Sequence, residues 1–259
     1  MLRAESVSFG YDGGFTLEDA TVTITPGSLT GLLGPNGCGK TTLLKLLCGV
    51  LRASSGRVLL RDRPLTTMTR RELARHVAVV PQETHPAFEY SVMEMVLMGR
   101  HPHLSAFQLE GPEDFEIAGQ ALEATATEHL ADRNYMTLSG GEKQRVVIAS
   151  ALAQATEILL LDEPTASLDL GYQLEVAGLL ARLNRERHVT MVLATHDLNL
   201  AASLCSRLVV MRAGRILAQG AIRDVLTADT VQQLYDVDAD VEFHQRAGHL
   251  TIVPVRRFR

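Results

Sequence analysis

Short apolar segments alternate with helical patterns along most of the chain. Residues 6–9, 21–25 and 29–33 contain alternating, β-branched or apolar positions, which predict strands. After the last of these, apolar residues recur at helical spacing at Leu43, Leu46, Leu47 and Val50. The glycine-rich segment 34–39 therefore joins a buried strand to a helix.

The middle of the chain has a helical pattern. Strand patterns are absent between residues 91 and 130, where Met93, Val96 and Leu97 share one helical face. Pro112 opens a second helix in the same region. We therefore expect an inserted helical lobe.

Strands return after this lobe. Residues 158–161 and 189–194 are apolar runs of strand length, and a helical pattern separates them. Alternation of strands and helices indicates an α/β fold with a mainly parallel sheet. Residues 208–211 and 215–218 flank a glycine turn and predict an antiparallel hairpin at the sheet edge.

Composition narrows the class of protein. The chain has 259 residues, 46% of them hydrophobic, which is enough for one large domain with an inserted lobe. Its 25 Lys and Arg residues are outnumbered by 30 Asp and Glu residues, so it lacks the basic surface typical of proteins that bind nucleic acid. We therefore expect no nucleic-acid partner.

The sequence also indicates a location. Its three cysteines show no paired spacing, which favours a reducing compartment. The first ten residues lack a signal peptide's apolar core, and no run approaches the about 20 apolar residues of a spanning helix. We expect a cytoplasmic protein whose membrane role would depend on partners.

Residues 34–41 read Gly-Pro-Asn-Gly-Cys-Gly-Lys-Thr and match the pattern of a phosphate-binding loop. In such a loop backbone N–H groups surround phosphates, and the lysine, here Lys40, neutralises the β and γ oxygens. Thr41 would bind Mg²⁺ through its hydroxyl. The alternative is a glycine-rich turn with a chance Lys-Thr, which the flanking strand and helix disfavour.

An apolar strand ends in two adjacent acids, Asp162 and Glu163. Ligand-binding groups of parallel sheets gather at the carboxyl ends of strands. Because successive residues point in different directions, Asp162 can face Mg²⁺ while Glu163 orients or deprotonates an attacking water. Taken alone, the pair could also be an acidic turn in solvent.

Residues 138–145, Leu-Ser-Gly-Gly-Glu-Lys-Gln-Arg, predict the start of a helix. Ser139 can cap it, and Glu142 stands three residues later, as in a capping box. The two glycines cost helix stability, and their benefit is a bare, positively polarised helix start that a phosphate can approach. The segment therefore implies a second anion site.

With these motifs the chain resembles the ATP-binding-cassette (ABC) ATPase family, whose signature sequence is LSGGxxQR, from about Val7 to Gly220. The resemblance implies a P-loop NTPase (RecA-like) fold with a mainly parallel sheet, an antiparallel β edge and an inserted α-helical subdomain. It also implies that Ser139, Gly140 and Gly141 contact ATP held by the phosphate loop of a second copy. ATP and Mg²⁺ are then the cofactors, and a head-to-tail dimer is the active form.

The resemblance assigns further residues to the site. Tyr11 would stack on adenine, Gln82 would reach Mg²⁺ and the attacking water, and His196 would contact the γ-phosphate. Asp169 belongs to the loop that couples the two sites of the dimer. The implied catalytic residues are Glu163, His196 and Gln82. The implied magnesium ligands are Thr41, Gln82 and Asp162. The implied nucleotide contacts are Tyr11, Gly34, Pro35, Asn36, Gly37, Cys38, Gly39, Lys40, Thr41, Thr42, Gln82, Ser139, Gly140, Gly141, Asp162, Asp169 and His196.

Within the family, residues 98–103, 168–175 and 196–202 are most similar to importers of iron chelates, haem and cobalamin. This implies a subunit at the cytoplasmic face of the plasma membrane that works with a separate permease and, indirectly, a substrate-binding protein. Another importer, an exporter, or an ABC ATPase acting on DNA or ribosomes are the alternatives.

The resemblance also implies a division of the chain. The core with its β subdomain would comprise residues 1–85 and 138–235, and residues 86–137 would form the helical subdomain. Residues 236–259 would form a C-terminal extension.

Three features allow more than one interpretation. Met93, Met95 and Met98 could line a surface for a permease helix or pack in the core of the lobe. His101 and His103 flank a proline and fit an interhelical loop better than a metal site. We also expect Cys38 to be partly reachable by thiol reagents when nucleotide is absent.

Overall fold

The computed structural model describes residues 1–105 and 107–257, so Phe258 and Arg259 of the C-terminal extension lie outside the described residues. The chain forms two compact units. The first unit is built from Met1–Thr67 and Asn184–Arg259, and the second from Met68–Leu183.

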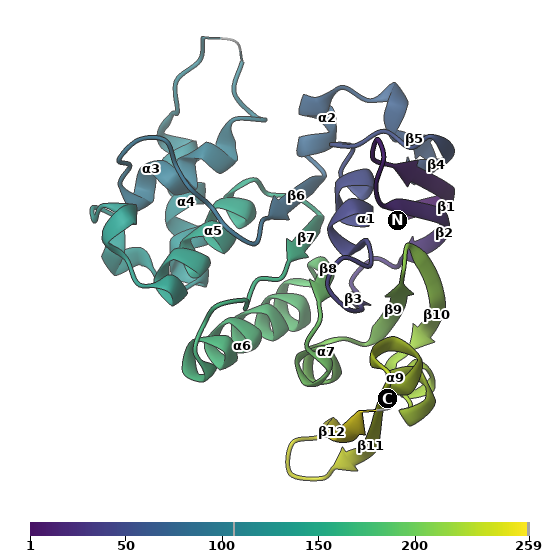
Figure 1. Ribbon diagram of the computed structural model, residues 1–259. Coiled ribbons are helices and arrows are strands. Elements are labelled where there is room, and N and C mark those ends of the chain that lie inside the picture. The colour runs from purple at the N-terminus through teal and green to yellow at the C-terminus, as the bar shows by residue number, and fades with distance from the viewer. Residues whose placement is uncertain (106, 258–259) are drawn as a thin grey trace. The chain divides into compact units, whose positions relative to one another are not determined.

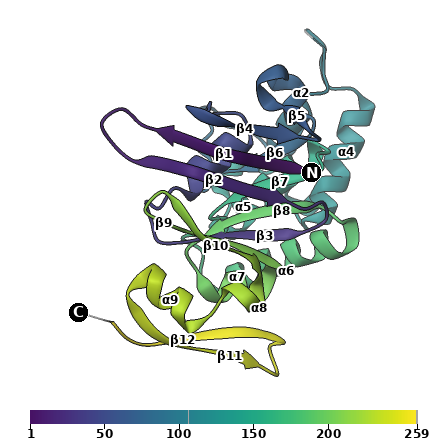
Figure 2. The same ribbon diagram turned by 90° about the vertical axis from the view of Figure 1, so that its right-hand side faces the viewer.

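Two sheets form the framework of the first unit (Figure 2). The antiparallel sheet has the order β2-β1-β4-β5, with β1 at Leu2–Gly10, β2 at Thr16–Ile24, β4 at Ser55–Leu60 and β5 at Arg63–Pro64. In the other sheet β3 (Leu29–Leu33) pairs in parallel with β8 (Thr190–Thr195) and β9 (Arg207–Arg212), and β10 (Arg215–Ala221) pairs antiparallel to β9. The predicted edge hairpin is therefore confirmed.

Helices and a second hairpin complete the first unit (Figure 1). Its helices are α1 at Lys40–Leu47, α7 at Leu198–Leu204, α8 at Ile222–Val225 and α9 at Ala228–Tyr235. The chain ends in the antiparallel pair β11 (Val237–His244) and β12 (His249–Arg257). Every residue of β3 and β8 is buried, as expected for parallel strands covered on both faces.

The second unit combines a parallel strand pair with the expected helical lobe. Its strands are β6 at Val77–Val80 and β7 at Ile158–Asp162. Its helices are α2 at Arg70–Ala74, α3 at Val92–Leu97, α4 at Pro112–Ala124 and α5 at Gly140–Ala153. Helix α6 spans Leu170–Arg187 and lies in the second unit up to Leu183. Helices α3, α4 and α5 pack side by side (Figure 1) around a core that includes Val92, Leu122 and Val146.

Three methionines of the lobe, Met93, Met95 and Met98, pack in its core. Met95 is 5% exposed, and Met93 and Met98 are partly buried against the same cluster. Core packing therefore accounts for these three residues.

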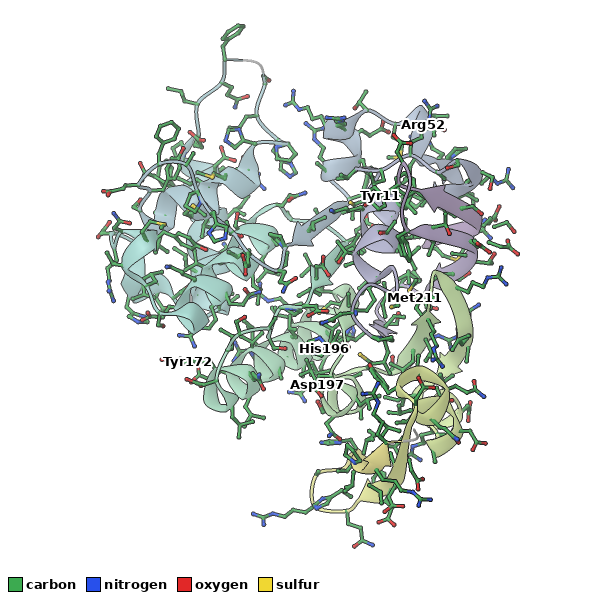
Figure 3. All side chains as sticks on the ribbon, in the orientation of Figure 1. Tyr11, Arg52, Tyr172, His196, Asp197 and Met211 are labelled. Carbon is green, nitrogen blue, oxygen red and sulfur yellow. The ribbon has the colours of Figure 1, made fainter. Side chains whose placement is uncertain are left out.

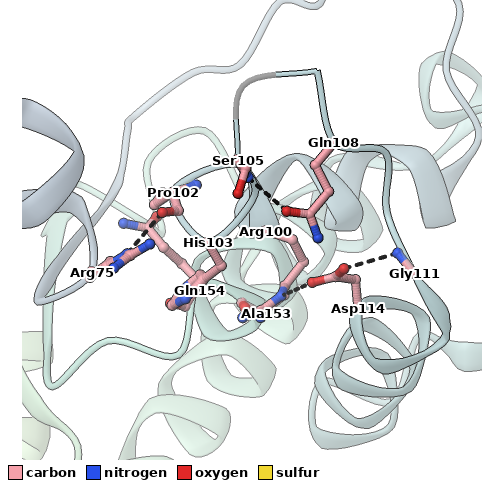
Figure 4. Close-up of polar contacts among 10 residues, drawn as sticks. All are labelled: Arg75, Arg100, Pro102, His103, Ser105, Gln108, Gly111, Asp114, Ala153 and Gln154. Atoms are coloured by element: carbon pink, nitrogen blue, oxygen red, sulfur yellow. Dashed lines mark hydrogen bonds and ion pairs between the residues drawn. The ribbon is translucent and has the colours of Figure 1, made fainter.

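The loop before α4 is fixed by polar contacts (Figure 4). Arg100 Nε pairs with Asp114 Oδ1 at 2.9 Å, and both side chains are buried. His103 Nε2 lies 2.9 Å from the carbonyl oxygen of Gln154. This contact ties the loop to the residue that follows α5.

None of the helices in the described part of the chain is both long enough and apolar enough to cross a membrane.

Candidate functional site

The phosphate loop, residues 34–39, leaves the buried strand β3 and enters α1. Gly37 and Gly39 have φ values of 77° and 108°. Both values lie in the left-handed region, which glycine adopts without a steric cost. The local sequence therefore accounts for the tight turn between the strand and the helix.

Neighbouring segments also require glycine in this loop. A Cβ at Gly34 would lie 2.2 Å from the carbonyl oxygen of Met211 in β9. A Cβ at Gly39 would lie 2.6 Å from the ring of Phe15, in the turn between β1 and β2. The loop is thus closely packed against Phe15 and Met211. The sequence motifs give no indication of these two contacts.

Lys40 begins α1 and is only 5% exposed. Its Nζ donates to the carbonyl oxygens of Gly34 at 2.8 Å and Pro35 at 3.3 Å. A buried ammonium group that faces the loop is a suitable donor for a phosphate.

His196 follows the strand beside β3. Leu33 of β3 lies opposite Thr195 of β8 in a parallel register, so Gly34 and His196 leave the sheet at the same end. His196 is exposed, and the next residue, Asp197, caps α7 by accepting the backbone N–H groups of residues 199 and 200 (Figure 3). The first unit therefore places the predicted γ-phosphate histidine at the edge where the phosphate loop begins.

Tyr11 lies in the turn between β1 and β2 and is 44% exposed. Its ring meets that of Phe9 edge to face, with centroids 4.9 Å apart. The same turn carries Phe15, which faces Gly39. An exposed aromatic ring on this turn supports the proposed stacking on adenine.

The expectation that Cys38 is reachable is wrong. Cys38 is 3% exposed, because its Sγ packs against Gly34, where a Cβ would come within 2.7 Å. Its carbonyl oxygen also accepts the backbone N–H of Gly214 at 3.1 Å. Cys38 is therefore a packing residue of the phosphate loop.

Three predicted residues lie at one end of the strand pair of the second unit. Val80 of β6 lies opposite Leu161 of β7, so Gln82, Asp162 and Glu163 leave this pair at the same end. Glu163 has a φ of 48°, a left-handed conformation that costs a non-glycine residue about 1 kcal/mol or more. Strained backbone of this kind is frequent at functional sites, which supports a role for Glu163.

The signature segment forms the predicted capping box at the start of α5. The Ser139 N–H donates to Glu142 Oε2 at 2.8 Å, and the Glu142 N–H donates to Ser139 Oγ at 3.4 Å. Hydrogen bonds from the Ser139 backbone and hydroxyl hold the pKa of Glu142 below its usual value. Glu142 therefore stays ionised and keeps this helix start ordered.

The signature glycines lie against the segment that contains Asp169. A Cβ at Gly141 would lie 2.4 Å from the ring of Tyr172, and one at Gly140 would lie 3.3 Å from Leu168. Asp169 Oδ1 accepts the N–H of Tyr172 at 3.1 Å. Tyr172 was given no role from the sequence, because a contact across 31 positions leaves no local pattern.

A hollow of about 180 Å³ lies beside the signature helix in the second unit. Its lining includes Gln82, Gly140, Lys143, Gln144 and Ser167. Within the described part of the chain, Gln144 Nε2 is buried without a hydrogen-bond partner. The second unit thus brings Gln82, the signature and the segment before Asp169 to one cavity.

The residues present fit ATP with Mg²⁺. Glycine leaves no side chain that would obstruct the phosphate loop, and Lys40 supplies a positive charge. In the first unit, the hydroxyl of Thr41 is an oxygen ligand of the kind that Mg²⁺ prefers, and in the second unit Gln82 and Asp162 carry such oxygens. Because Mg²⁺ usually keeps waters and binds phosphate oxygens, it needs no cluster of protein carboxylates.

Comparison with known proteins gives the same family as the sequence motifs. The family model described as "ABC transporter" matches residues 17–166. The chain is 40% identical to the iron(3+)-hydroxamate import ATP-binding protein FhuC of Bacillus subtilis (strain 168), over 93% of this chain and 89% of that protein. It is 41% identical to the hemin import ATP-binding protein HmuV of Gloeobacter violaceus, over 98% and 94% of the two chains.

Solved structures share the fold. A putative metal-chelate type ABC transporter in an inward-facing conformation matches with a TM-score of 0.86 and 30% identity, over 98% of this chain and 96% of that chain. A dimeric post-hydrolysis state of the ATP-binding cassette MJ0796, bound to ADP and Pi, matches with a TM-score of 0.74 and 27% identity, over 86% and 99% of the two chains.

Proposed function

This chain belongs to the ABC transporter family as an ATP-binding subunit, and from that premise we propose that it powers import of an iron chelate, haem or cobalamin through a separate membrane permease. The observation that carries the proposal is similarity over 98% of the chain to a hemin import subunit, at 41% identity. The chain is an ATP hydrolase, since this is the activity of the family to which it belongs.

The proposed reaction is attack of water on the γ-phosphate of ATP, which breaks the bond between the γ-phosphorus and the bridging oxygen and releases ADP and phosphate. Lys40 and the N–H groups of the phosphate loop hold the β- and γ-phosphates, and Glu163 orients or deprotonates the water. His196 and Gln82 align the γ-phosphate and the water. Bound Mg²⁺ would neutralise charge on the phosphate oxygens.

A second copy of the chain completes the proposed site. Ser139 caps a helix of 14 residues that begins with Gly140 and Gly141, and the N-terminus of this helix is a suitable partner for a negatively charged γ-phosphate. ATP should therefore join two copies, and loss of the γ-phosphate should separate them. This opening and closing is the movement that a permease would convert into transport.

Blocking hydrolysis tests this proposal. Replacing the general base in Glu163→Gln should lower turnover about 10² to 10⁴-fold with ATP binding retained. By light scattering, this variant should be dimeric with ATP and monomeric with ADP. Adding Ser139→Arg should abolish the dimer, whereas adding Ser54→Arg, at an exposed serine before β4, should not.

Two results would contradict the proposal. A Glu163→Gln, Ser139→Arg chain that still dimerises with ATP would show that the signature does not complete the site.

The cargo is tested by growth. Cells lacking this chain should fail to grow on an iron chelate or haem as sole iron source, or on external cobalamin, and Lys40→Ala should not restore growth. Normal growth on all three would exclude the proposed import.

A further inference from the structure

The backbone of His196 is bonded to the C-terminal part of the first unit. Tyr235, the last residue of α9, donates its hydroxyl to the carbonyl oxygen of His196 at 3.0 Å. The two residues are 39 positions apart. The bond therefore connects the residue proposed to contact the γ-phosphate with a segment beyond the phosphate-binding sheet.

A second connection lies three residues after His196. Asn199 Nδ2 donates to the carbonyl oxygen of Ile252 at 3.2 Å, and the Ile252 N–H donates to Asn199 Oδ1 at 2.8 Å. Ile252 is 3% exposed and lies in β12. The Asn199 side chain thus pairs with this strand as a neighbouring backbone would, and it fixes α7 to the C-terminal hairpin, β11 and β12 (Figure 2).

The residues around Tyr235 are themselves held in place. Leu234 is 2% exposed. Arg212, in β9, donates to the carbonyl oxygen of Gln233 and pairs with Asp236 Oδ2 at 2.9 Å. Because Gln233 and Asp236 flank Tyr235, the sheet strand β9 fixes the position from which the Tyr235 hydroxyl reaches His196.

His196 itself lies between two fixed points. On one side is Thr195, the last residue of the buried strand β8, whose hydroxyl accepts the Asp197 N–H at 3.0 Å. On the other side Asp197 caps α7. His196 is exposed, and the backbone between these two fixed points sets the direction in which its side chain leaves the chain.

We propose that Tyr235 is a positioning residue for ATP hydrolysis, which holds the His196 backbone so that the imidazole stays aligned with the γ-phosphate. The inference rests on the proposed role of His196. It gives the segment after α8 a task in the reaction, since α9 carries Tyr235 and the C-terminal hairpin holds α7. Small losses of alignment reduce the rate of a reaction without weakening substrate binding to the same extent.

The first test removes one hydroxyl. Tyr235→Phe keeps the ring and deletes the bond to His196, so kcat of the full chain should fall about threefold to tenfold, as one hydrogen bond of about 1 kcal/mol predicts. KM for ATP should stay within about twofold. Tyr90→Phe, at a partly buried tyrosine of the second unit, is the matched control and should hydrolyse ATP at the normal rate. An unchanged kcat in Tyr235→Phe would overturn the inference.

The second test asks whether the effect passes through His196. Single-turnover hydrolysis is measured for the wild type, Tyr235→Phe, His196→Ala and the double variant. Once the imidazole is gone its alignment no longer matters, so Tyr235→Phe should cause no further loss in the His196→Ala background. An equal loss in both backgrounds would show that Tyr235 acts elsewhere and would overturn the inference.

The same four proteins separate this inference from the proposed function. A strong loss in His196→Ala with none in Tyr235→Phe contradicts the positioning role alone. Normal hydrolysis in His196→Ala contradicts the assignment of His196, and the positioning role with it. As a direct readout, the imidazole resonance that disappears in His196→Ala should shift in Tyr235→Phe, and an unshifted resonance would overturn the inference.

Discussion

The signature residue Gly141 must remain glycine because a side chain from outside the signature packs against it. The ring of Tyr172 lies where a Cβ at Gly141 would stand, 2.4 Å away. We predict that Gly141→Ala forces α5 and α6 to shift and lowers the free energy of unfolding by about 1–3 kcal/mol, as overpacking does. Urea denaturation measures the change.

Two further variants separate packing from phosphate access at this position. Gly140→Ala should cost less stability, because its Cβ would stand 3.3 Å from the end of the flexible Leu168 side chain. Gly141→Ala with Tyr172→Ala should regain stability and still hydrolyse ATP slowly if the phosphate needs a bare helix start. A stable single variant Gly141→Ala would contradict the packing argument.

Residues defined by a local motif could be predicted, and residues defined by distant contacts could not. The capping box of Ser139 and Glu142 was predicted from a spacing of three residues and is confirmed. The exposure of Cys38 was predicted wrongly, because the loop is covered by groups that lie far away in sequence, such as Gly214. The roles of the remaining site residues stay predictions that the proposed variants test.

At the scale of elements, the loop before α4 depends on one buried ion pair. The side chains of Arg100 and Asp114 are 7% and 11% exposed, and Asp114 also accepts the Gly111 N–H at 3.0 Å (Figure 4). Asp114→Ala leaves a buried guanidinium without its partner, so we predict a loss of about 3 kcal/mol or more in the free energy of unfolding. Urea denaturation followed by circular dichroism tests this.

Two controls test the role of burial: an apolar replacement of both partners, and the loss of one partner from an exposed ion pair. Arg100→Met with Asp114→Leu should recover most of the lost stability, since no buried charge remains. Glu186→Ala removes one partner of the exposed pair Arg185–Glu186 and should cost less than about 1 kcal/mol. Equal losses in Asp114→Ala and Glu186→Ala would contradict the role of burial.

Strands were predictable from the sequence where all of their residues are buried and most of them are therefore apolar. The strand at 29–33 was predicted with the bounds it has in the structure, because all five residues are buried. The C-terminal hairpin was not predicted as strands. The alternation of acidic and apolar residues in β11 is itself a strand pattern, so this strand could have been predicted. The contacts of the hairpin with α7 and α9 are not visible in the sequence.

At the scale of the whole molecule, the predicted site residues divide between the two units. Lys40 and His196 belong to the first unit, whereas Gln82, Glu163 and the signature belong to the second. The fold class was predictable, because the motifs that carry the chemistry also mark the family. The division into a core, a helical subdomain and a C-terminal extension stays a prediction. In the structure β6 and β7 group with the helices of the second unit, a grouping that depends on tertiary contacts.

The shielding of the three cysteines has a consequence for the protein under oxidative stress. Cys38 and Cys205 are buried, Cys48 is half-buried, and burial raises the pKa of Cys48 and Cys205. Because peroxide attacks exposed thiolates, these side chains should remain reduced when peroxide is present.

We predict that millimolar hydrogen peroxide leaves ATP hydrolysis nearly unchanged, with no sulfenic acid at Cys38 by mass spectrometry. Rapid inactivation with oxidised Cys38 would show that the phosphate loop opens to solvent. A motor shielded in this way would keep hydrolysing ATP under conditions that inactivate enzymes with exposed reactive thiolates.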